Sequence, residues 1–98
     1  MNNFYYPYVK GLIKHTLTNL RPSDSFIDTN GDKYYSISLH LTGKDVVNSM
    51  KENTLHTVIK TISEIPKLFG WDNNVVTLEY YDDRDGCGAL VKIFLIES

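Results

Sequence analysis

The sequence contains a single cysteine, Cys87, which excludes an internal disulfide and any zinc site built from several thiolates. No apolar run approaches the roughly 20 residues that a membrane-spanning helix needs. The first residues show neither a basic start followed by an apolar stretch nor a small-residue cleavage site, so no secretion signal is expected. Together these absences favour a cytoplasmic protein with no contact to a membrane.

Size and composition are typical of one globular domain covering residues 1–98. The chain is 42% hydrophobic and 22% charged, both ordinary for such a domain. A chain of this length removes roughly two-thirds of its extended-chain surface from water, enough for one core without cross-links.

Charge is unevenly distributed between the two ends of the chain, although the net charge is only −2. Residues 1–22 carry Lys10, Lys14 and Arg21 and no acid, whereas residues 72–98 carry six acids against two cations. Such polarity along the chain indicates charged partners but does not bear on the fold.

Apolar spacing predicts two helices. The first begins near Pro7, which suits a first helical turn, and ends at Arg21-Pro22. The second follows Gly43 and ends near Pro66 or Gly70. Either Asp45 or Ser49 is expected to cap its start, and Ser49 with Glu52 fits the spacing of a capping box. The apolar stripes that support these helices are Val9, Leu12, Ile13, Leu17 and Leu20 in the first, and Val47, Leu55, Val58, Ile59 and Ile62 in the second.

Alternation of apolar and polar residues predicts four strands. In residues 25–41, Asn30-Gly31 favours a two-residue type I′ turn, which would pair Phe26 with Tyr35. Two further strands are predicted at residues 75–81 and 89–96, and the segment YYDDRDGCG at residues 80–88 is expected to hold the turn between them. The predicted fold class is α+β, in the order αββαββ, with a four-stranded, mainly antiparallel sheet and two helices packed on one face.

The face of this sheet away from the helices is expected to be unusually apolar. Tyr34, Leu90, Phe94 and Ile96 are predicted to lie there, interrupted mainly by Lys92. An apolar surface of several hundred Å² is seldom left without a use in a monomer. Three coverings stay open: a second copy in a homodimer, another protein, or the N-terminal residues 4–6 folded over a central last strand.

The segment at residues 80–88 lacks the pattern of a catalytic or metal site. Asp83 and Asp85 precede Gly86 as in a calcium loop, but Tyr81 occupies the first ligand position. Cys87 stands among acids, which disfavour a thiolate, and no phosphate-loop, dinucleotide, zincin or serine-hydrolase motif occurs. We therefore expect no catalytic residue, no metal and no cofactor.

The same segment favours protein docking, because aromatic residues bordered by charge are frequent in protein interfaces. Carboxylates placed in this way attract a basic partner. The sequence therefore predicts a non-enzymatic protein-binding module. The narrower hypothesis is an inhibitor of a basic nucleic-acid enzyme, of the toxin-immunity or phage-inhibitor type. The residues predicted to bind the partner are Glu79, Tyr80, Tyr81, Asp82, Asp83 and Asp85.

Two alternatives belong to other classes. Nucleic-acid binding would combine aromatic side chains near the N-terminus with three cations, but three cations are few for that role. The aromatic residues are Phe4, Tyr5, Tyr6 and Tyr8, and the cations are Lys10, Lys14 and Arg21. A small-molecule sensor or enzyme would have its pocket between sheet and helices, with His40 or His56 at its edge.

Overall fold

The computed structural model describes residues 5–84 and 86–97, the side chain of Asp83 excepted. They form one compact α+β domain. The helices are α1 (Tyr6–Thr18), α2 (Lys44–Lys51) and α3 (Leu55–Lys67), with a short 3-10 helix, η1, at Pro22–Asp24. The strands are β1 (Phe26–Ile27), β2 (Lys33–Thr42), β3 (Asn74–Asp83) and β4 (Gly86–Ile96).

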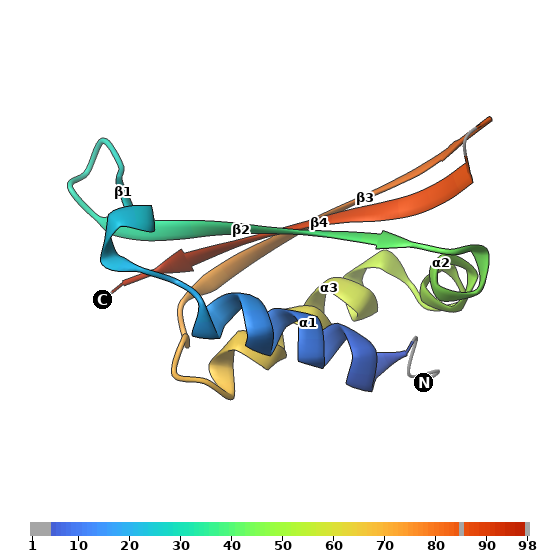
Figure 1. Ribbon diagram of the computed structural model, residues 1–98, viewed down its shortest axis with the longest axis horizontal. Helices are drawn as coiled ribbons and strands as arrows, with labels where there is room; N and C mark the ends of the chain where they lie inside the picture. The colour runs from blue at the N-terminus through green and yellow to red at the C-terminus, as the bar shows by residue number, and fades with distance from the viewer. Residues whose placement is uncertain (1–4, 85, 98) are drawn as a thin grey trace.

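The four strands make one sheet in the order β1-β2-β4-β3, with every neighbouring pair antiparallel. The predicted α+β class and four-stranded antiparallel sheet are confirmed. β4, the last strand in sequence, lies between the two other long strands. Figure 1 shows the three helices together on one side of the sheet.

The core lies between the sheet and the helices. Strand side chains alternate between the two faces of a sheet, and here alternate residues of β2 and β4 are buried against the helices. Val9 and Ile13 of α1 and Val58, Ile62 and Ile65 of α3 are fully buried in the same cluster. The strand residues of this core are Tyr35, Ile37, Leu39, Leu41, Val76, Ala89, Val91, Ile93 and Leu95.

The single second helix predicted from the sequence is wrong, because the structure has two helices there. α2 ends at Lys51, and Thr54 begins α3 as its N-cap, with its hydroxyl accepting a hydrogen bond from the N–H of Thr57 (3.2 Å). Ser49 lies inside α2, so the predicted capping box is also wrong. Met50 of α2 and Val58 of α3 are both fully buried. The apolar stripe therefore continues across the break between the two helices, and the stripe alone does not reveal that break.

The register predicted for the first hairpin is shifted by one residue. Phe26 pairs with Tyr34, not with Tyr35, because the loop contains five residues. The carboxylate of Asp28 accepts hydrogen bonds from the N–H groups of Asn30 (2.8 Å) and Asp32 (2.9 Å), and this network replaces the tight two-residue turn. A shift of one residue exchanges the two faces, so Phe26 joins the side away from the helices.

The second hairpin extends further than predicted. β3 reaches Asp83 and β4 begins at Gly86, so most of residues 80–88 is strand rather than turn. Gly86 has a φ of 127°, a conformation that other residues rarely adopt. Neighbouring residues of this segment therefore point to opposite faces of the sheet.

Candidate protein-binding surface

We call the side of the sheet away from the helices the open face. It carries the residues of the long strands that alternate with the core positions, and no described helix lies on it (Figure 1). At about 3.3 Å per residue and about 4.8 Å between strands, this face is roughly 30 Å long and 15 Å wide. Its residues are Phe26 of β1; Tyr34, Ser36, Ser38, His40 and Thr42 of β2; Leu90, Lys92, Phe94 and Ile96 of β4; and Val75, Thr77, Glu79 and Tyr81 of β3.

One end of the open face is apolar. The rings of Phe26 and Tyr34 stack with their centroids 5.5 Å apart, and the ring of Phe94 lies 6.4 Å from that of Tyr34. Phe26 and Val75 are 55% and 50% exposed, whereas Tyr34, Phe94 and Ile96 are partly buried by one another. The apolar side chains that β4 carries at this end, Phe94 and Ile96, are therefore neither fully covered nor fully open.

Leu90 does not join this end. A polar row formed by Thr77, Lys92 and Ser38 crosses all three long strands between Phe94 and Leu90. The four apolar residues predicted for the surface are thus divided, with Tyr34, Phe94 and Ile96 at one end and Leu90 toward the other. Phe26, which the sequence analysis did not assign to this face, is its most exposed aromatic residue.

The other end of the open face is organised by Tyr81. Its side chain passes over Gly88 of the central strand and its hydroxyl makes a hydrogen bond to Nε2 of His40 on β2. The two ring centroids are 5.4 Å apart. A Cβ built on Gly88 would lie 2.6 Å from Cε1 of the Tyr81 ring, so only glycine leaves room for this crossing. A glycine inside a strand is a signal of such close approach.

Strand alternation divides the residues predicted to bind a partner. Glu79 and Tyr81 lie on the open face, whereas Tyr80 and Asp82 lie on the face of the helices. The side chain of Asp83, also in β3, is outside the described part of the chain, and Asp85 lies outside the described residues. The six residues therefore do not form one continuous patch.

Tyr80 has a structural environment of its own. Its ring packs against the core, with the ammonium of Lys51 5.3 Å from the ring centre. Its hydroxyl is buried and has no hydrogen-bond partner among the described residues. Burial raises the pKa of Tyr80 above the ordinary value of 10.0.

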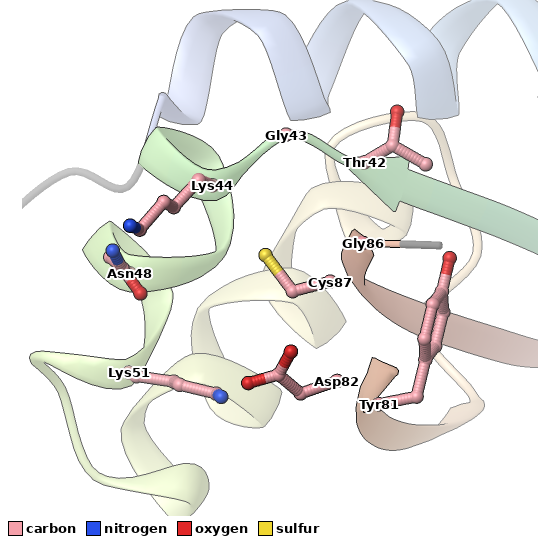
Figure 2. Close-up of a pocket in the computed structure, with 9 residues that line it drawn as sticks. All are labelled: Thr42, Gly43, Lys44, Asn48, Lys51, Tyr81, Asp82, Gly86 and Cys87. Carbon is pink, nitrogen blue, oxygen red and sulfur yellow. The ribbon is translucent and has the colours of Figure 1, made fainter. Parts of the chain in front are cut away.

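Cys87 lies on the face of the helices, in a pocket of about 500 Å³ between α2 and the end of the β3–β4 hairpin. Figure 2 shows its thiol directed toward α2, with Lys44 and Asn48 beyond it and Lys51 near Asp82. The sequence analysis placed this cysteine in the segment expected to hold the turn, but it lies within β4. The turn was misplaced because β4 begins earlier than its apolar residues indicate.

The alternatives from other classes gain no geometric support. His40 projects from the open face and His56 is exposed on α3, so His40 does not edge a pocket between sheet and helices. Tyr6 starts α1 and packs against the core. Tyr8 is exposed, but Lys10 and Lys14 follow it by two and six positions, spacings that do not share one face of a helix. Within residues 5–84 and 86–97, no three metal-ligating side chains gather.

Comparison with known proteins gives no relative: the chain matches no family model, no curated protein and no solved structure. None of the helices in the described residues combines the length and apolar character needed to cross a membrane. The open face is therefore judged on its own chemistry.

Proposed function

We propose that this protein is a non-enzymatic protein-binding module that docks a partner on the open face of its sheet. The observation that carries the proposal is the Tyr81 side chain held across Gly88 by His40. A tyrosine fixed before binding loses little conformational entropy on contact, and such aromatic anchors contribute strongly to protein interfaces. Leu90 and Glu79 lie beside it and supply apolar contact and charge.

The partner we propose has a basic surface. Residues 79–85 carry four carboxylates and a single arginine. Glu79 is exposed next to Tyr81 on the open face, where it can meet a cationic side chain of the partner. Opposite charge raises the rate of encounter, most strongly at low salt. Enzymes that hold nucleic acid present such surfaces, and the specific role we propose is inhibition of one of them, of the toxin-immunity or phage-inhibitor type.

The apolar end of the open face supplies the second contact area. Phe26 and Val75 are half exposed at one end, and Val75 lies about 20 Å from Tyr81 along β3 at the strand repeat of about 3.3 Å. A polar row containing Lys92 separates the two ends. A partner that covers the whole face would bury both ends, so substitutions at either end are expected to weaken it.

The test is capture of a binding protein from the source organism by the wild-type chain and by matched variants. Tyr81→Ala should weaken binding of the captured protein at least tenfold, because it removes the anchor. Tyr8→Ala is the control, since Tyr8 is an exposed tyrosine (52%) that lies on α1, away from the open face. Glu79→Lys should slow association at low salt and change it less at high salt.

Equal binding by the wild type, Tyr81→Ala and Glu79→Lys would overturn the proposal. Retention on heparin that Lys10→Ala/Lys14→Ala abolishes would support nucleic-acid binding through α1 instead.

A further inference from the structure

The outer edge of β3 has unused hydrogen-bonding capacity. β3 is an edge strand of ten residues, and β4 pairs with only one side of it. At the end of β4, the N–H of Ile96 points toward β3 and donates to the carbonyl of Asn73 (2.9 Å). The N–H of the next residue, Glu97, points the other way, toward β2, and donates to the carbonyl of Lys33 (2.9 Å). Because bonded pairs alternate in an antiparallel ladder, the odd-numbered residues of β3 bond to β4.

The even-numbered residues of β3 therefore direct their N–H and C=O groups away from the sheet. No backbone partner for these groups occurs among the described residues. The strand contains neither proline nor lysine and its register shows no bulge, so three common protections of an edge strand are missing from it. We call residues outward-facing when their backbone N–H and C=O groups point away from the sheet in this way. They are Asn74, Val76, Leu78, Tyr80 and Asp82.

The opposite edge of the sheet is different. The two residues of β1 cover the start of β2, and Ser36 and Ser38 line a shallow pocket with residues from the end of α1 and from η1. The segment from the end of α1 to η1 therefore lies beside the edge of β2. The β3 edge is the longer uninterrupted one among the described strands.

We propose that two copies of the chain associate through antiparallel pairing of their β3 edges, giving a continuous eight-stranded sheet. A two-fold axis at Leu78 pairs Asn74 with the second copy's Asp82 and Val76 with its Tyr80. This register uses all five outward-facing residues of each chain, giving about ten hydrogen bonds, a number typical of a stable interface.

Side-chain pairing favours the same register. On the open face it sets Glu79 opposite Thr77 of the second copy and Tyr81 opposite its Val75, so no acid faces another acid. A register shifted by two residues in one direction sets Glu79 against Glu79 of the second copy, and a shift in the other direction sets Asp82 against Asp72. Both shifted registers also leave one outward-facing residue of each chain unpaired. Like charges directly opposite each other destabilise a strand pair.

The test measures the dimer dissociation constant by sedimentation equilibrium at low salt. Thr77→Glu sets two carboxylate pairs opposite each other across the axis and should raise the constant roughly five- to tenfold. Thr77→Lys creates two opposite-charge pairs with Glu79 and should lower it by a similar factor. Both differences should shrink at high salt.

Ser38→Glu is the matched control. Ser38 and Thr77 are both exposed on the open face, and both lie directly opposite Lys92, one on each side of β4. A carboxylate at position 38 therefore meets the same lysine but is far from the β3 edge. The proposal predicts that Ser38→Glu leaves the dissociation constant unchanged.

Two results would overturn this dimer. One is a wild-type protein that stays monomeric at about 100 μM, a concentration at which even a weak dimer would be detected. The other is a dimer disrupted by Ser38→Glu but not by Thr77→Glu, which would locate the contact on the open face or the β2 edge. Because the assay contains no partner protein, its outcome is independent of the docking function proposed above.

Discussion

Replacing Gly88 with alanine tests whether Tyr81 is held across the central strand. The backbone at Gly88 is compatible with any residue, since its φ is not in the left-handed region. The atoms nearest to an added methyl group belong to the Tyr81 side chain, whose Cε1 would lie 2.6 Å from the new Cβ. The alanine must therefore displace Tyr81 and break its hydrogen bond to His40.

The expected size follows from two opposing effects. Forcing a methyl into an occupied position costs about 1–3 kcal/mol. Replacing glycine in a strand stabilises by about 0.5–1 kcal/mol, because the unfolded chain loses freedom. Gly88→Ala should therefore lower the free energy of unfolding by roughly 0.5–2 kcal/mol in the wild type. In a Tyr81→Ala background the clash is gone, and the same change should raise it by about 0.5–1 kcal/mol.

The assay is urea unfolding followed by the fluorescence of Trp71. This is the only tryptophan in the sequence, and its ring packs edge-on against buried Tyr35 at 5.4 Å, so it reports on the core. The four proteins form a double-mutant cycle whose coupling energy isolates the interaction between positions 81 and 88. If Gly88→Ala destabilises equally in both backgrounds, the reasoning is refuted.

Two further changes test other parts of the fold. Gly11→Ala, at an exposed helical position where a Cβ meets no atom within 4 Å, should raise the free energy of unfolding by about 0.5–1 kcal/mol in urea titrations; a loss of stability would contradict the assignment of α1. Tyr80→Phe should be neutral or stabilising, because it removes a buried hydroxyl without a described partner. Since burial raises the pKa of Tyr80, the folded protein retains that proton longer, and stability should fall as pH rises above about 10. Tyr80→Phe should reduce this alkaline loss in unfolding measured across pH 9–11, and an unchanged pH profile would contradict the burial of the hydroxyl.

Hydrophobic periodicity correctly predicted which side of a helix or strand is buried in the core. The stripe containing Val9 and Ile13 lies in the core as expected, and so do Tyr35 and Ile37 of the alternating strand. The prediction failed where a side chain forms hydrogen bonds that override the sequence signal for a turn. Asp28 organises a five-residue loop that Asn30-Gly31 alone does not indicate, and the resulting register places Phe26 on the open face.

The main feature of the candidate site could not be predicted, because it joins residues far apart in the sequence. His40 and Tyr81 are 41 positions apart and meet only because β4 lies between β2 and β3. The order of strands is not visible in apolar spacing. Gly88 was the available signal, since a glycine within a strand often marks a close approach to its backbone.

The central position of β4 has a consequence for how the chain folds. Each of the two other long strands lies against β4 and neither touches the other, so no three-stranded intermediate can be built from the residues that precede Gly86. Tyr34 pairs with Phe26 on one side, but its neighbour on the other side, Ile96, is synthesised only near the end of the chain. During synthesis the sheet would therefore assemble late and in one event, and a chain cut before β4 should remain unstructured rather than partly native.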